Sequence, residues 1–322
     1  MKACVDLGGT KIAVSLIEAK AGQEISLAQA TAALQSRRVE PTEKSGPPDT
    51  LSRQVLRMLD QACEAAGIRG QDIEAVGVSS CGPFVMVDGM LEISNPNICG
   101  GMAGPARGLP NDWVSVPLEA PLRSRFADRL RIENDGVGAL QAERRWGALQ
   151  GYSHCAYVTW STGIGFGLCV DGRILRGKHG NAGHAGHTFV SDHSDALCGC
   201  GNMGDLEGVV AGNAIARRFA GAGYPGASAL FAAAQSGDAA AQAIVDELCR
   251  VLGRGLYNMV ATLDLERISL GGGVFWNHRE YLLPRLSAQI HGKLPALTDQ
   301  FELVAAGLGE RVGDFGALAL VS

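Results

Sequence analysis

The chain has 322 residues, 46% of them hydrophobic and 19% charged, and 28 Lys and Arg against 33 Asp and Glu give a net charge of −5. This composition supports a sizeable core and, at roughly 150 residues per domain, two domains or one bilobed domain. It excludes a disordered acidic tail, and the mild negative charge without a basic block argues against nucleic acid or an anionic membrane as the main partner.

Glycine is the unusual residue in this composition. The chain has 44 glycines, which is about twice ordinary usage. Because they follow no Gly-X-Y period and form no Gly/Ser tract, they indicate neither collagen nor a flexible linker. We interpret them as backbone held close to a ligand, often a phosphate.

The first half of the chain is predicted to be an α/β lobe. Two strands are expected within residues 2–19, joined by a tight turn at 6–11, and a third strand is expected near Ile25. Apolar residues at helical spacing predict a helix over 50–66 that ends before Gly67. The other expected elements are a strand at 74–80, a hairpin over 84–93, an irregular loop over 95–121, a helix over 122–130 and a strand over 131–133.

The order of strand, glycine turn and strand begins again in the second half. A helix over 137–149 precedes a strand over 155–160, the turn 161–165 and a strand over 166–170. The later elements are a long helix over 244–263, a strand over 267–270, a strand over 301–306 and a helix over 308–321. We expect the last two to pack back on the first lobe. The lobes themselves are taken as residues 1–133 with 308–322 and residues 134–307.

No secretory signal or membrane span is expected. The first residues lead directly into a strand-like run, and no stretch approaches the roughly 18 consecutive apolar residues of a spanning helix. The nine cysteines are an odd number, and we interpret them as reduced buried thiols with a possible metal site among them. A cytoplasmic protein is therefore expected.

The turn between the first two strands has the composition of a phosphate-binding loop, Asp6-Leu7-Gly8-Gly9-Thr10-Lys11. Gly8 and Gly9 let backbone N–H groups approach phosphate oxygens. Thr10 offers a hydroxyl group, and Asp6 can hold a hydrated Mg²⁺ on the phosphate. Taken alone, the turn also fits an ordinary hairpin.

Two further glycine turns follow predicted strands. Thr162 and Gly163 lie in a turn of similar composition, and two such turns can clasp a polyphosphate from both sides. The third turn is Gly271-Gly272-Gly273, where bare backbone would let a flat base lie against it. The three turns in this order point to a nucleotide.

With these turns in place, the sequence resembles the ROK sugar kinases, in the actin/hexokinase/Hsp70 superfamily, over essentially the whole chain. The matching segments are 6–11 and 162–165 for the phosphate motifs, 271–273 for the adenosine motif, 133–135 for the catalytic motif, 96–97 for the substrate-lobe motif, and 183–187 with 198–207 for the sugar and zinc signatures. The resemblance implies a two-lobed actin-like (ribonuclease H-like) α/β fold, each lobe a mixed sheet flanked by helices. It also implies ATP and Mg²⁺ as cofactors.

The resemblance assigns roles to the motif residues. Asp135 would be the general base that takes the proton of the acceptor hydroxyl. Asn134 and Asn97 would bind sugar hydroxyls. The alternative for the Asn134-Asp135 pair is a helix N-cap. The loop from 98 to 116 looks longer than usual and is either a pocket rim or a subunit contact.

The predicted sugar pocket departs from the family pattern. The family usually has Glu where this chain has His184, and an imidazole offers one donor and one acceptor in its place, which leaves the sugar and its anomer open. By the resemblance, His187 both contacts the sugar and ligates zinc, and Glu207 contacts the sugar. For Glu207 the alternative is a carboxylate favoured by a helix N-terminus.

The predicted zinc site departs from the pattern as well. His187, Cys198 and Cys200 match the family, but Asp205 stands where a third Cys is expected. Zinc accepts carboxylate ligands, so the four residues can form a structural site. Either His193 or Asp195 is an alternative fourth ligand. The other interpretation is a metal-free loop.

The resemblance favours an ATP-dependent sugar kinase that transfers the γ-phosphoryl group to a hexose or an N-acylhexosamine bound in the cleft between the lobes, at O6. Family members are commonly dimers, so a homodimer is expected. The alternatives are a sugar-sensing regulator and a catalytically silent sugar-binding relative. Regulators of the family carry a DNA-binding domain before the first phosphate motif, and the intact Asp6, Thr10, Asn134 and Asp135 argue against a silent protein.

Overall fold

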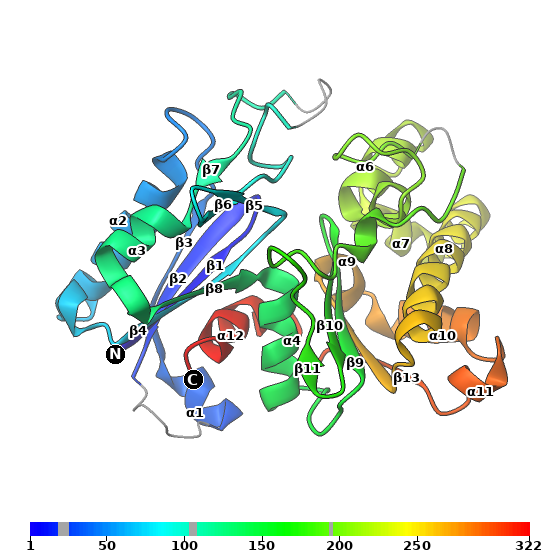
Figure 1. Cartoon of the computed structure of the whole chain (residues 1–322). Coiled ribbons are helices and arrows are strands. Elements are labelled where there is room, and N and C mark those ends of the chain that lie inside the picture. The colour runs from blue at the N-terminus through cyan, green and yellow to red at the C-terminus, as the bar shows by residue number, and fades with distance from the viewer. Residues whose placement is uncertain (19–25, 103–107, 193–195) are drawn as a thin grey trace. The chain divides into compact units, whose positions relative to one another are not determined.

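The structure, a computed structural model, describes residues 1–18, 26–102, 108–192 and 196–322 (Figure 1). The chain forms two compact units. The first contains residues 1–146, 176–182 and 311–322, and the second contains 147–175 and 183–310. Among the described residues, no helix has both the length and the apolar character needed to span a bilayer.

The first unit is built on a five-stranded mixed sheet with the order β3-β2-β1-β4-β8. Strands β2 and β3 are antiparallel, as are β1 and β2, whereas β4 and β8 run parallel to β1. The strands are β1 (Lys2–Leu7), β2 (Lys11–Ile17), β3 (Leu34–Pro41), β4 (Ala75–Ser80) and β8 (Leu130–Asn134). The predicted hairpin is present as β5 (Phe84–Val87) and β6 (Met90–Ile93), which pair with the short β7 (Val116–Pro117).

Helices cover both faces of this sheet, which is why its central strands are apolar on both sides (Figure 1). Alternate residues of β1 (Ala3, Val5 and Leu7) join the core with the buried stripe of α2 (Thr50–Ala65). Helix α3 (Glu119–Phe126) lies beside α2, and α12 (Val312–Ala319) packs on β1, β4 and α4 (Asp135–Trp146).

Most of the predicted elements of this unit are present, with three differences. Residue 25 lies outside the described residues; a short helix α1 (Leu27–Ala33) precedes the third strand, which is β3. Helix α3 begins at Glu119, before the expected residue 122. Helix α4, placed in the second lobe by the expected division at residue 134, packs in the first unit.

The loop of residues 98–116 is ordered around one side chain, at least in the part that the structure describes. The side-chain oxygen Oδ1 of Asn111 accepts hydrogen bonds from the N–H groups of Gly100 (2.7 Å) and Trp113 (3.1 Å). Its amide nitrogen donates to the carbonyl oxygens of Ile98 (3.0 Å) and Lys44 (2.8 Å). An asparagine amide has donors and an acceptor on one rigid group, so it can tie two chain segments together.

The second unit repeats the strand order of the first in a sheet β11-β10-β9-β12-β13, with the same parallel and antiparallel pairs. Its strands are β9 (Cys155–Trp160), β10 (Ile164–Val170), β11 (Arg173–Ile174), β12 (Arg267–Gly271) and β13 (Glu302–Ala305). Its helices are α5 (Leu206–Val210), α6 (Gly212–Phe219), α7 (Ala227–Gln235), α8 (Ala239–Leu263), α9 (Gly273–Trp276), α10 (Arg279–Ile290) and α11 (Pro295–Thr298).

The pairing of the last strand, β13, differs from the prediction. Strand β13 pairs with β12 in the second unit, with Ile268 opposite Leu303, and does not return to the first lobe as expected. The following helix α12 does return to the first unit. Leu303 of β13 is buried in the core of the second unit, and the strand packs against α10.

Candidate functional site

The parallel strands of the first unit bring the predicted motifs to one edge of the sheet. Leu7 on β1 lies opposite Ser80 on β4, and Ser80 lies opposite Asn134 on β8. Parallel strands that end in register deliver the residues after them to a common edge. The first glycine turn and Asp135 therefore emerge side by side, although more than a hundred residues separate them in the chain.

The first glycine turn is held by its own backbone and by a neighbour that the sequence did not single out. The Gly8 N–H group donates to the Lys11 carbonyl oxygen at 2.9 Å. The Thr42 hydroxyl donates to the Gly8 carbonyl oxygen (2.7 Å), and the Thr42 N–H group donates to the Thr10 carbonyl oxygen (3.0 Å). Thr42 is thus a positioning residue for the turn; it lies in a polar stretch with no motif that could have identified it.

Asn97, predicted to bind the sugar, lies against this turn. A Cβ atom placed on Gly9 would come within 2.9 Å of the Asn97 Cβ, which is closer than two carbon atoms pack. The Asn97 N–H group donates to the Asn95 side-chain oxygen at 2.8 Å. The close approach explains why the second residue of the turn is glycine, and it places the substrate-lobe motif at the phosphate motif.

Three acids, Asp6, Asp135 and Asp314, gather behind the turn, and Asp314 is buried. The Asp6 carboxylate contacts the backbone of Gly313 at the start of α12, where a Cβ would overlap it. Burial raises the pKa of Asp6 to about 7, and the negative charges of Asp135 and Asp314 add to this rise. The Arg37 guanidinium Nε binds both oxygens of Asp314, at 3.2 and 3.1 Å. This concentration of carboxylates is the environment that a divalent cation neutralises.

Asp314 was not predicted as a site residue. It is the one acid in the otherwise apolar α12 sequence VGDFGALA, and its side chain is 7% exposed. An acid in an apolar helix was the signal that could have identified it, because such a group is rarely buried without a partner. Here the partner is Arg37 on β3.

Asn134, the last residue of β8, caps helix α4 with its side chain, as the capping interpretation predicted. Its side-chain oxygen accepts a hydrogen bond from the Gly136 N–H group at 2.9 Å. The Gly136 N–H group also lies 2.8 Å from Asp135 Oδ1. The catalytic and sugar-binding roles of the pair stay predictions.

The second and third glycine turns lie together in the second unit. The Ser161 N–H group donates to the Gly163 carbonyl oxygen (3.0 Å), and the Gly212 N–H group donates to the Ser161 carbonyl oxygen (2.8 Å). Gly272 has a φ of +90° and packs against the Trp160 carbonyl at the end of β9. The two motifs predicted for the nucleotide, which include Thr162 and Gly273, are therefore neighbours.

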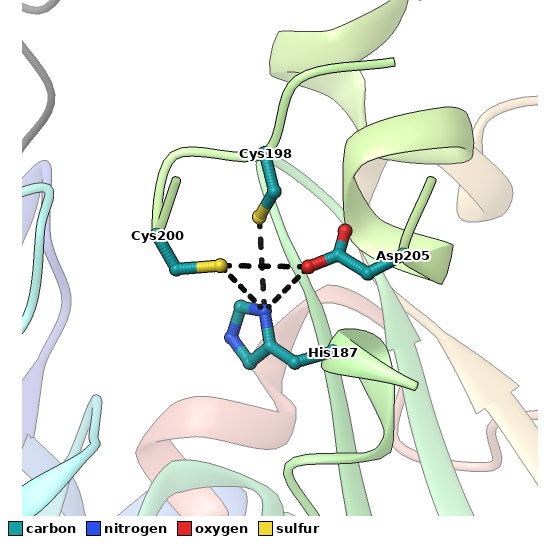
Figure 2. Close-up of side chains that lie close together, drawn as sticks. All are labelled: His187, Cys198, Cys200 and Asp205. Carbon is teal, nitrogen blue, oxygen red and sulfur yellow. Dashed lines mark hydrogen bonds and ion pairs between the residues drawn. The ribbon is translucent and has the colours of Figure 1, made fainter. Parts of the chain in front are cut away.

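Four side chains in the second unit converge as the zinc signature predicted (Figure 2). His187 Nδ1 lies 3.2 Å from Asp205 Oδ2, 3.5 Å from Cys200 Sγ and 3.7 Å from Cys198 Sγ. Cys200 Sγ lies 3.5 Å from Asp205 Oδ2. The alternative fourth ligands, His193 and Asp195, lie outside the described residues.

These spacings fit a tetrahedral metal site. Zinc bonds of about 2.0 Å to nitrogen or oxygen and about 2.3 Å to sulfur place neighbouring ligand atoms roughly 3.3–3.8 Å apart. The donor set of one imidazole, two thiols and one carboxylate is also one that zinc accepts. The cluster could therefore hold zinc, with one ligand atom from each residue.

The charges within this cluster are already paired. Hydrogen bonding to Asp205 raises the pKa of His187. Burial by itself would raise the pKa of Asp205, but its hydrogen bonds with His187 and Gly208 hold it below the usual value. Burial raises the pKa of Cys198 and so favours its neutral thiol form. A bound cation would reverse this and favour the thiolate.

Comparisons with known proteins agree with these motifs. A model of the ROK family matches residues 2–322. The chain belongs to the ROK family. A glucokinase from Aeropyrum pernix is 31% identical over 284 residues, covering 82% of this chain and 84% of the relative. An N-acetylmannosamine kinase from Salmonella newport is 32% identical over 273 residues, covering 84% and 82%.

A solved structure resembles this ROK protein over nearly its whole length. The ROK family glucokinase from Streptomyces griseus, in complex with glucose and AMPPNP, matches with a TM-score of 0.73 and 26% identity, covering 99% of this chain and 98% of that one. Together with the repeated strand order, this match confirms the predicted α/β actin-like ATPase fold.

The histidine that departs from the ROK pattern lies beside the metal cluster. The His184 ring stacks on the His187 ring with centroids 6.1 Å apart and an interplanar angle of 23°. His184 precedes the short 3₁₀ turn of residues 185–187, and His187 is its last residue. An imidazole at residue 184 therefore meets another imidazole, whereas the family pattern would place a carboxylate there.

Replacing Asp6 with Asn should stabilise the protein in the absence of nucleotide and magnesium. The native pKa of Asp6 is about 7 and its unfolded value is 3.8, so the native state holds this proton more tightly, and ionisation lowers stability as pH rises between these values. At pH 8 we expect Asp6→Asn to raise the free energy of unfolding by about 1 to 4 kcal/mol. Urea denaturation at pH 5 and pH 8 measures the effect.

The control for this experiment is Asp264→Asn, which removes an exposed carboxylate at the end of α8. We expect it to leave the pH dependence of stability unchanged. The same pH dependence in wild type and Asp6→Asn would contradict a raised pKa at Asp6.

Proposed function

We propose that this ROK family member is an ATP-dependent kinase that transfers the γ-phosphoryl group to O6 of a hexose or an N-acylhexosamine. One observation carries the proposal: a single sheet edge of the first unit holds a phosphate-type glycine turn, Asn97, and the carboxylates of Asp6 and Asp135. The names of the relatives, glucokinase and N-acetylmannosamine kinase, support the class of substrate.

Phosphoryl transfer asks a protein mainly for positioning and for neutralisation of charge. The backbone N–H groups of the turn at Gly8 and Gly9, with the Thr10 hydroxyl and the Lys11 ammonium, would bind phosphate oxygens. Asp6 would hold the hydrated Mg²⁺, which when bound neutralises phosphate charge. The raised pKa of Asp6 is consistent with a carboxylate whose natural partner is a cation.

The acceptor hydroxyl needs a group that takes its proton, and we assign that role to Asp135. A carboxylate at the same sheet edge as the phosphate turn is suitably placed for it. Asn134 uses its side-chain oxygen to cap α4, so the amide N–H groups of Asn134 would donate to a sugar hydroxyl. Asn97 would serve the sugar from the other motif of this unit.

The second unit would contribute to both substrates. Thr162, Gly163, Gly272 and Gly273 would line the nucleotide. The sugar would be contacted by His184, His187 and Glu207. If a metal were bound at Nδ1 of His187, which faces the other three residues of the cluster, Nε2 would carry the proton and could donate to a sugar hydroxyl.

We also propose a structural zinc ion held by His187, Cys198, Cys200 and Asp205. The spacing of their ligand atoms supports it. In this site zinc would orient the His187 ring and tie the loop of residues 187–205 together.

Asp135→Asn tests the base. The substitution keeps the size of the side chain but removes the proton acceptor, so we expect kcat to fall by about 10²–10⁴-fold with little change in KM for ATP. ADP release is measured with glucose, mannose, fructose, N-acetylglucosamine and N-acetylmannosamine. Asp128→Asn, which removes a fully exposed carboxylate of the same unit, is the control and should keep wild-type turnover.

Two results would count against the assignment. Near wild-type turnover of Asp135→Asn would refute its role as base. A wild-type protein that releases ADP with none of the five sugars would refute the kinase proposal for these substrates.

Asp205→Asn tests the fourth metal ligand. An asparagine can still cap α5 but lacks the anionic oxygen, so we expect zinc affinity to fall by roughly tenfold or more. Metal analysis of the purified proteins and competition with a chromophoric chelator measure it. Asp238→Asn is the matched control, because Asp238 caps α8 in the same way and lies outside the cluster. Equal zinc affinity in Asp205→Asn and wild type would remove Asp205 from the site.

A further inference from the structure

The carboxylate of Glu207 contacts both the metal cluster and the second glycine turn. Its Oε2 accepts a hydrogen bond from the Ile164 N–H group at 3.0 Å. Its Oε1 lies 3.6 Å from Cys198 Sγ. A Cβ placed on Gly163 would come within 2.6 Å of Oε2. Both oxygens are therefore engaged by the protein, which a residue that served the sugar alone would not require.

The segment that carries Glu207 holds the glycine turn at several points. The Gly212 N–H group donates to the Ser161 carbonyl oxygen (2.8 Å), and the Asn213 N–H group donates to the Thr162 carbonyl oxygen (3.3 Å). Together with the hydrogen bond from Ile164 to Glu207, three hydrogen bonds therefore join residues 207–213 and residues 161–164. The position of the turn thus follows the position of this segment.

The same segment begins at a residue of the metal cluster. Asp205 is fully buried and divides its two oxygens: Oδ1 accepts from the Gly208 N–H group at 2.6 Å, and Oδ2 faces His187 and Cys200. Since Oδ1 sets the first turn of α5, the carboxylate joins the metal cluster rigidly to the segment that carries Glu207.

We propose that Glu207 is a positioning residue for the second glycine turn, through which metal bound at the cluster tightens nucleotide binding. The metal would fix Asp205 and Cys198, these fix Glu207, and Glu207 fixes the backbone N–H group of Ile164. Coupling of this kind is reciprocal, so nucleotide must tighten metal binding by the same factor. The inference rests on the proposed function in one respect, namely that the turn binds ATP phosphates.

The test measures binding of AMPPNP with Mg²⁺ by calorimetry, without sugar, in reducing buffer. Wild type, Glu207→Ala and Glu207→Gln are each compared after zinc loading and after stripping with a chelator. We expect stripping to weaken AMPPNP binding to wild type by about 5- to 20-fold, within the usual range of coupling between sites. Glu207→Ala should bind weakly in both states, and Glu207→Gln should retain wild-type behaviour because its amide oxygen can accept from Ile164.

Two further variants make the result specific. Glu280→Ala removes an exposed carboxylate on α10 of the same unit and should leave both affinities unchanged. Gly163→Ala pushes on Glu207 Oε2 from the turn side and should lose the metal dependence as Glu207→Ala does. It keeps the test available if Glu207→Ala fails to fold, which circular dichroism would reveal.

The outcomes separate this inference from the proposed function. Wild-type AMPPNP affinity in Glu207→Ala, or an affinity that stripping leaves unchanged in wild type, would overturn the coupling while leaving the kinase assignment intact. Metal-dependent AMPPNP binding without phosphorylation of any sugar would support the coupling and refute the sugar assignment. A zinc-loaded wild type that binds no AMPPNP would overturn both.

Discussion

The register of the parallel strands is the constraint on which the candidate site depends. In the first unit Leu7, Ser80 and Asn134 end their strands side by side, so the loops that follow all leave the sheet at one edge. In the second unit Thr159 of β9 pairs with Gly271 of β12 in the same manner. Because side chains alternate along a strand, a register shift of one residue would turn the Asp6 side chain to the other face of its sheet. In either sheet, the same shift would also move the glycine turns that follow the strands. The pairing of the strands therefore brings together motifs that lie far apart in the sequence, which no local motif can do.

The carboxylates gathered in the first unit lower its stability when Asp6 is ionised. Desolvation of Asp6 beside the charges of Asp135 and Asp314 disfavours its ionised form, and carboxylates with such shifted pKa values cluster at functional sites. Arg37 binds both oxygens of Asp314, and the charges of Arg37 and Lys11 oppose the rise in the pKa of Asp6 without cancelling it. A cation bound at Asp6 would lower the cost of ionising this carboxylate and would therefore stabilise the folded unit.

The local sequence pattern predicted the helices, the strands and the glycine turns. It could not predict contacts between residues that are distant in the sequence. Helix α2 followed from apolar spacing and the C-terminal Gly67, and β9 with its turn followed from composition. The expectation that β13 packs back on the first lobe was wrong, because nothing in its residues shows which strand it pairs with. Thr42 was missed for the same reason: its hydrogen bonds to the Gly8 turn join residues over thirty positions apart. The convergence of His187, Cys198, Cys200 and Asp205 could be predicted because the family pattern contains it, but the contact of Glu207 with Ile164 could not.

Asp205 shows why a departure from a ligand pattern can preserve a site. A thiolate in this position would have a single sulfur atom to face both the metal and the backbone N–H groups of α5. A carboxylate has two oxygens, and here Oδ1 caps α5 through Gly208 while Oδ2 faces the metal cluster. A carboxylate in place of a thiolate would lower the affinity for zinc, since soft thiolates are preferred, but it adds a capping interaction worth about 1 kcal/mol at the start of the helix. This cap needs no metal, so the start of α5 would depend less on a bound ion than in a site with three cysteines. Were a metal bound, the carboxylate would connect it to the segment that reaches the glycine turn.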